Sequence, residues 1–135
     1  MVGAVVITHG NIGEAVVEAV KSITGKVDKV RVISVREQDG VDALREKLLK
    51  AVRDVDGVKG VLVFTDMFGG TPTNIALSVL EEDRVEVLAG MNLPVMLKFE
   101  NYRKEKPLSE LALYLKEYGQ SSIVLAGNVL KEKKQ

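Results

Sequence analysis

The chain has 135 residues, of which 46% are hydrophobic and 28% are charged, as expected for a single soluble globular domain. Lysine plus arginine and aspartate plus glutamate number 19 each, so the net charge is zero, which argues against nucleic acid or an anionic membrane surface as a partner. Cysteine is absent, which excludes disulfides, thiolate catalysis and zinc–sulfur sites. No apolar run approaches the roughly 20 residues that span a bilayer, and we expect a cytoplasmic protein.

Strand-length apolar runs alternate with segments of helical periodicity along the whole chain. A strand buried on both faces is expected to be almost entirely apolar, whereas a helix against a sheet repeats its apolar residues every three or four positions. In chain order the pattern predicts strand 2–8, a helix between residues 11 and 25, strand 29–35, a helix between 39 and 55, strand 60–65, helix 71–80, strand 84–89, a turn at 90–94, strand or helix at 95–99, helix 107–118 and a short strand 122–126.

This alternation predicts an α/β fold with a doubly wound, mainly parallel central sheet and helices on both faces. The runs 2–8 and 60–65 are the most apolar and are expected to be central neighbours, whereas 29–35 contains Arg31 and Ser34 and suits an edge. We find no internal repeat and no linker composition. The pattern therefore predicts one domain over residues 1–130, followed by a frayed basic tail at 131–135.

Two chemically active side chains follow the two most apolar runs. His9, the only histidine, ends the first run, and Asp66 ends the run 60–65. Because neighbouring parallel strands end at the same edge of a sheet, the imidazole and the carboxylate are expected to meet there. A carboxylate that accepts from one ring nitrogen fixes the tautomer and leaves the other nitrogen as a nucleophile. A lone histidine after a strand, or an aspartate at a turn, is otherwise an ordinary surface residue.

A glycine-rich turn directly after Asp66 supplies a place for an anion. Gly69 and Gly70 can adopt positive φ and bring backbone N–H groups toward a phosphate. Thr71 offers a hydroxyl, and Pro72 suits the first turn of a helix, whose positive dipole end then faces the anion. Together with His9 and Asp66, this turn predicts reversible phosphorylation of a histidine.

The same residues carry a resemblance to a known family. The stretch Asp66 to Asn74 (DMFGGTPTN), with Thr8-His9-Gly10 at the amino end and the loop Gly90 to Pro94 (GMNLP), resembles the mannose-type enzyme IIA component of the bacterial phosphoenolpyruvate-dependent sugar phosphotransferase system. The motifs occur in the family's order and spacing, and the likeness extends from residue 2 to about residue 127.

The resemblance implies a phosphohistidine carrier. His9 would accept a phosphoryl group from HPr and pass it to an enzyme IIB component during sugar uptake, and the membrane would be involved only through the sugar permease. Asp66 would be the partner of His9, while Gly69, Gly70 and Thr71 would bind the phosphoryl oxygens. The resemblance also implies a homodimer that exchanges the last strand, 122–126, in antiparallel pairing. No metal and no cofactor is expected, and the sequence contains no nucleotide-binding glycine motif.

Four apolar residues around the predicted site are candidates for partner binding: Met67, Phe68, Met91 and Leu93. Other functions remain open at this point. A histidine phosphatase or mutase needs a second histidine, which the chain lacks, and a nucleotide- or flavin-binding module needs phosphate loops that are missing. Two alternatives keep the chemistry of His9: a phosphocarrier subunit of a dihydroxyacetone kinase, and a regulatory phosphoprotein that moves no sugar.

Overall fold

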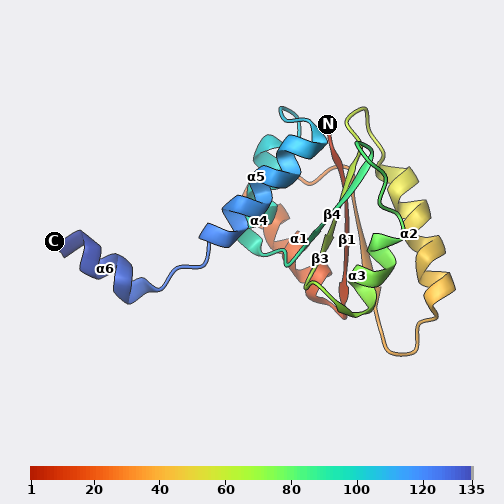
Figure 1. The fold of residues 1–135 in the computed structure, drawn as a ribbon, viewed down its shortest axis with the longest axis horizontal. Helices are drawn as coiled ribbons and strands as arrows, with labels where there is room; N and C mark the ends of the chain where they lie inside the picture. Colours follow the sequence, from red (N-terminus) through yellow and green to blue (C-terminus); the bar gives the residue numbers. More distant parts are fainter. Residues whose placement is uncertain (135) are drawn as a thin grey trace.

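The computed structural model describes residues 1–134 and shows a central sheet with helices on both faces (Figure 1). The elements in chain order are β1 (Gly3–His9), α1 (Ile12–Thr24), β2 (Val30–Val35), α2 (Val41–Val55), β3 (Val61–Thr65), α3 (Gly70–Leu77), β4 (Val85–Ala89), α4 (Leu93–Tyr102), α5 (Leu108–Ser121) and α6 (Ala126–Lys134).

The four strands form an all-parallel sheet in the order β2-β1-β3-β4. The two apolar runs are central neighbours and β2 lies at an edge, as the sequence predicts. The chain goes from β1 to β2 on one side and then returns to β3 on the other, so the winding direction changes between β1 and β3. Ligand crevices in such sheets form at the carboxyl ends of the strands beside this point.

Alternate side chains of the central strands enter two separate cores. Val6 and Phe64 point toward α1, α4 and α5, whereas Val5 and Val63 point toward α2 and α3. Figure 1 shows the same division, with α2 and α3 on one side of the sheet and α1, α4 and α5 on the other. Because β1 and β3 are covered on both faces, they are almost entirely apolar up to their last residues, and their ends are held rigidly at the edge of the sheet.

Two predictions about the second half of the chain are settled by the structure. The ambiguous stretch 95–99 is helical, within α4, because Asn92 caps this helix by accepting a hydrogen bond from the backbone N–H of Val95 at 3.0 Å. The strand predicted over Ser122–Ala126 is wrong for the single chain, since Ser122–Leu125 are irregular and α6 begins at Ala126. This segment leads away from the body, and without a neighbouring strand it has no ladder to join (Figure 1).

The carboxyl-terminal residues, which the sequence predicts to be a frayed tail, are mostly helical in the structure. Residues 131–134 of the predicted basic tail belong to α6, and residue 135 lies outside the described residues. Exchange of residues 122–126 between subunits involves a second chain and stays a prediction. Among residues 1–134, every helix is too short or too polar to cross a membrane.

Candidate active site

His9 and Asp66 are brought into direct contact at the carboxyl ends of β1 and β3. His9 Nδ1 lies 2.8 Å from Asp66 Oδ2, and the backbone N–H of His9 donates to the same oxygen at 3.1 Å. An ionised carboxylate can only accept, so Nδ1 carries the proton and donates it to Asp66. The two hydrogen bonds fix both the position and the tautomer of the ring, as the sequence predicts for neighbouring strands.

The remaining ring nitrogen, Nε2, is not engaged by Asp66. It carries the lone pair when Nδ1 is protonated, and the His9 side chain is 46% exposed, so a second molecule can reach it. Asp66, by contrast, is 11% exposed, and its Oδ1 is buried without a hydrogen-bond partner among the described residues. Burying a carboxylate oxygen without a hydrogen-bond partner costs folding free energy. The need for a negative charge beside the imidazole ring explains why the site accepts this cost.

The turn after Asp66 wraps closely around the imidazole. Gly69 and Gly70 have φ of 100° and 81°, in the region that favours glycine, and α3 begins at Gly70. A Cβ built on Gly70 would lie 3.2 Å from Cε1 and 3.3 Å from Nε2 of His9. Only glycine therefore allows this close approach, which places the amino end of α3 beside the nucleophilic nitrogen. Gly69 is the N-cap residue of α3, two positions before Thr71.

Buried threonines hold this turn and the start of α1 in place. Thr73 Oγ1 lies 2.8 Å from Thr65 Oγ1 and also donates to the carbonyl of Met67. Behind His9, Thr8 Oγ1 accepts from the backbone N–H of Gly13 at 2.9 Å. The sequence analysis does not single out these threonines. A threonine near the end of an apolar run could nevertheless have indicated a side chain that anchors the following helix.

An open groove of about 540 Å³ lies next to His9. Its lining includes Thr71 from the start of α3 and the loop between β2 and α2, which contributes Arg36, Glu37, Gln38 and Asp39. Thr71 thus lines the same groove as His9, and its binding of phosphoryl oxygens stays a prediction. The sequence does not predict that the β2–α2 loop lines the site. A charged loop between two elements has no sequence feature that shows it lies next to a residue of the neighbouring strand.

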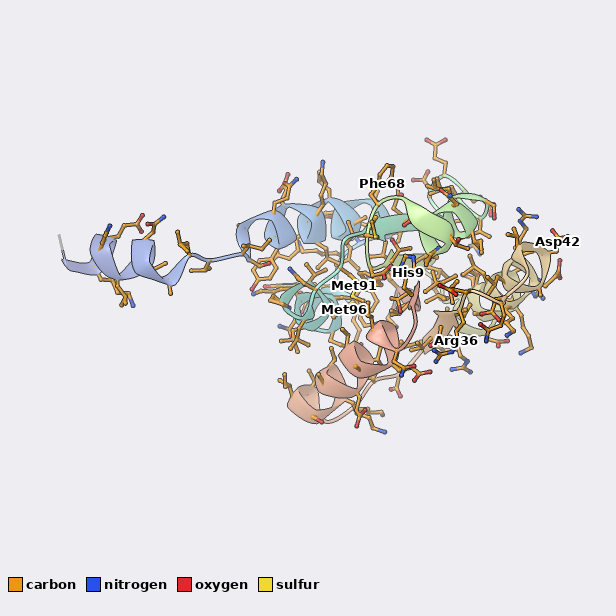
Figure 2. All side chains as sticks on the ribbon, turned by 90° about the horizontal axis from the view of Figure 1, so that it is seen from below. His9, Arg36, Asp42, Phe68, Met91 and Met96 are labelled. Atoms are coloured by element: carbon orange, nitrogen blue, oxygen red, sulfur yellow. The ribbon has the colours of Figure 1, made fainter. Side chains whose placement is uncertain are left out.

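The four partner-binding candidates differ in how much surface they offer. Phe68 is 78% exposed and Met67 is 52% exposed, and Leu93 is partly buried. Met91 is only 8% exposed and packs into the core with α4 and α5, so it has little surface for a partner. Figure 2, seen from the side of the carboxyl ends of the strands, labels His9, Phe68 and Met91.

The arrangement around His9 is suited to nucleophilic chemistry. Among residues 1–134 there is no group of three or more histidine, aspartate or glutamate side chains that could hold a metal ion. An oriented imidazole beside backbone N–H groups and a helix amino end is suited to bind an anion and attack its phosphorus.

Comparison with known proteins identifies this arrangement. A family model described as "PTS system fructose IIA component", EIIA-man, matches residues 3–113. The chain belongs to the EIIA-man family. It is therefore a mannose-type EIIA component of the sugar phosphotransferase system, and EIIA proteins of this family are phosphotransferase components.

Individual relatives cover almost the same range. The fructose-specific EIIA component of Bacillus subtilis is 31% identical over 135 residues, which is 99% of this chain and 92% of that protein. The sorbose-specific EIIA component of Lacticaseibacillus casei is 30% identical over 112 residues, covering 82% and 80%. Among solved structures, an EIIA component from Streptococcus agalactiae is 26% identical with a TM-score of 0.84, covering 95% of this chain and 99% of that one. The EIIA fold thus extends over nearly the whole chain.

Proposed function

We propose that this EIIA component is a phosphohistidine carrier that accepts a phosphoryl group from HPr on His9 Nε2 and passes it to an enzyme IIB component. The observation that carries the proposal is the 2.8 Å contact between His9 Nδ1 and Asp66 Oδ2, which leaves Nε2 free and oriented. Asp66 orients the ring, while Gly69, Gly70 and Thr71 bind the phosphoryl oxygens at the start of α3.

The transfer is an in-line displacement between two imidazoles. The lone pair of His9 Nε2 forms the new P–N bond as the P–N bond in the donor breaks and its electron pair returns to the donor's ring. His9 keeps its Nδ1 proton, so the phosphorylated ring is cationic, and the carboxylate of Asp66 balances that charge. The phosphoryl oxygens carry negative charge throughout, which the backbone N–H groups at Gly70 and Thr71 stabilise.

The relatives favour enzyme IIB as the acceptor. The curated proteins that match include fructose- and sorbose-specific EIIA components and, at 28% identity, the mannose-specific EIIAB component of Escherichia coli K12, of which this chain covers 38%. All three are named as parts of sugar-specific systems. On this proposal a separate or attached IIB unit receives the phosphoryl group, and the protein works on the cytoplasmic side of a sugar permease.

A labelling experiment tests the proposal. Enzyme I, HPr and labelled phosphoenolpyruvate should phosphorylate the protein once per chain, through a bond that is labile in acid and stable in alkali. His9→Ala should abolish labelling, because no other histidine exists in the chain. Gln38→Ala, which changes a polar side chain of the same groove, is the matched control and should be labelled normally.

Labelling of His9→Ala at the wild-type level would disprove the carrier role of His9. The acceptor is then identified by mixing the phosphorylated protein with a IIB domain or with a dihydroxyacetone kinase. Rapid loss of label to IIB supports the transport role. Loss only to the kinase, or to neither acceptor, would replace that role with one of the two alternatives that share the chemistry of His9.

A further inference from the structure

The groove beside His9 contains a guanidinium group that the phosphoryl-transfer site does not yet use. Arg36 directly follows Val35, which pairs with His9 in the sheet, and the carbonyl of Val35 accepts from the N–H of Gly10 at 2.9 Å. Arg36 therefore lies at the carboxyl end of β2, on the opposite side of His9 from Asp66 and α3. Figure 2 shows His9 and Arg36 on the same side of the molecule.

The hydrogen bonds of Arg36 leave its charge without a counter-charge. Its Nη2 donates to Asn11 Oδ1 at 2.7 Å, and its backbone N–H donates to Asp39 Oδ2 at 2.8 Å. No carboxylate within residues 1–134 lies within ion-pair distance of its guanidinium, although Glu37 and Asp39 line the same groove. Four other arginines do have such a partner: Arg31, Arg45, Arg84 and Arg103.

A neutral amide oxygen is a weaker partner for a guanidinium than a phosphoryl group. Arginine binds phosphate through two parallel charge-assisted hydrogen bonds, which are roughly twice as strong as neutral ones. A phosphoryl group on His9 Nε2 would bring two negative charges to a groove that Arg36 already lines. Moving from Asn11 Oδ1 to the phosphoryl oxygens would then exchange a neutral acceptor for a charged one.

We propose that Arg36 binds the phosphoryl group of phosphorylated His9, from the side of the groove opposite Gly70 and Thr71. The inference rests on the proposed function, since it concerns the phosphorylated state of the same site. Arg36 and the amino end of α3 then bind the phosphoryl group from two sides. While His9 is unphosphorylated, the Arg36 guanidinium donates its hydrogen bond to Asn11 instead.

The inference predicts a specific electrostatic effect. A cation in contact with a phosphoryl group favours the dianion over the monoanion and lowers the pKa of that group. Removal of the Arg36 charge should therefore raise the phosphoryl pKa. A guanidinium that only braces the loop through Asn11 would leave this pKa unchanged, so the measurement separates the two roles.

The test uses chemical phosphorylation of the full-length protein. Phosphoramidate, a small phosphoryl donor, should phosphorylate the single histidine without any protein partner, and ³¹P NMR follows the phosphoryl group through a pH titration. In Arg36→Gln the phosphoryl pKa should rise by about one pH unit relative to wild type. Arg31→Gln is the matched control, because it removes one positive charge from the same strand outside the groove, and it should titrate like wild type.

Two further variants complete the test. Arg36→Lys keeps the charge and should titrate close to wild type. Asn11→Ala removes the resting partner of Arg36 but not its charge, and it should leave the phosphoryl pKa unchanged or lower it. An unshifted pKa in Arg36→Gln, an equal shift in Arg31→Gln, or a shift in Asn11→Ala equal to that in Arg36→Gln would overturn the inference.

The experiment also separates a failure of this inference from a failure of the proposed carrier role. If HPr fails to phosphorylate the wild-type protein, the proposed function is wrong, but phosphoramidate still produces the phosphorylated His9 on which Arg36 is tested. If HPr phosphorylates the protein and Arg36→Gln shows no change in phosphoryl pKa, the carrier role stands and only the assignment of Arg36 is lost.

Discussion

At the scale of single residues, the site depends on how closely the backbone approaches one ring. Nδ1 of His9 is occupied by Asp66 and Nε2 faces the turn at Gly70, so the two ring nitrogens have separate environments. Any side chain at position 70 would occupy space within van der Waals contact of the ring. The glycine is therefore required both for its φ and for its lack of a Cβ.

These two requirements can be separated by comparing Gly70→Ala with Gly69→Ala. Both residues have positive φ, so each variant should lose about 1–3 kcal/mol of stability from backbone strain. Only the new methyl of Gly70→Ala would press on His9, because a Cβ on Gly69 meets nothing within 4 Å. We expect phosphoryl transfer to be slowed much more strongly in Gly70→Ala. Urea unfolding and the transfer rate measure the two effects, and equal rates in the two variants would contradict this account.

At the scale of secondary-structure elements, a buried arginine joins α4 to the amino ends of β1 and β2. Arg103 is 1% exposed and donates to the carbonyls of Val2, Asp28 and Lys29, with distances of 2.6 to 3.0 Å. It also forms an ion pair with Glu100 at 2.7 Å and lies over the ring of Phe99. Burial lowers the pKa of Arg103 from its usual value, and Glu100 partly offsets this shift. All three nitrogens of its guanidinium group thus donate hydrogen bonds inside the protein.

Replacing Arg103 should destabilise the fold without changing the residues around His9. Arg103→Met fills a similar volume but leaves three carbonyls and the Glu100 carboxylate without their partner, and we expect a loss of about 3–5 kcal/mol in the free energy of unfolding. Arg45→Met is the control, because Arg45 is exposed and pairs only with Asp42, at 3.5 Å; its stability should change by less than about 1 kcal/mol. Urea unfolding followed by circular dichroism gives both values, and equal stabilities would refute the role of Arg103.

At the scale of the whole molecule, the carboxyl-terminal segment and the outer edge of β4 lack neighbouring strands in the single chain. β4 pairs only with β3, so its outer edge is open. Ile123, Val124 and Leu125 are 84%, 62% and 70% exposed, between the body and the projecting α6 (Figure 1). A row of exposed apolar residues and an open strand edge are both features that association with another chain covers.

We therefore expect the protein to be a dimer in solution, with residues 122–126 exchanged between subunits. Wild type should sediment as a dimer at micromolar concentration. The double change Ile123→Glu with Leu125→Glu should give a monomer, because two charges would have to be buried at the interface. Leu113→Glu, at a 56% exposed position of α5, is the control and should remain dimeric. A wild-type monomer, or a dimeric double variant, would rule out this exchange.

The amino-acid sequence alone predicts the order of the elements up to α5 and the central pair of strands. Residues 2–8 and 60–65 are almost entirely apolar, and this pattern depends only on burial of both faces of a strand, which is a local property. It also predicts that His9 and Asp66 meet, because two neighbouring parallel strands can end only at one edge of the sheet. Gly69 and Gly70 are predictable for a similar reason, since a tight turn around an anion requires positive φ.

Other features depend on packing between distant parts of the chain and have no local signal. Met91 is a candidate for partner binding from the sequence, but it is only 8% exposed and packs with α4, whose position depends on its contacts with α1 and α5. Arg36 lies beside His9 only because β2 pairs with β1, and the charge of Arg103 is compensated by carbonyls about 75 and 101 positions away. The segment 122–126 has the composition of a strand, yet a strand forms only where another strand offers hydrogen bonds. Local patterns specify which face of an element is buried, whereas the partner on that face is selected by the fold as a whole.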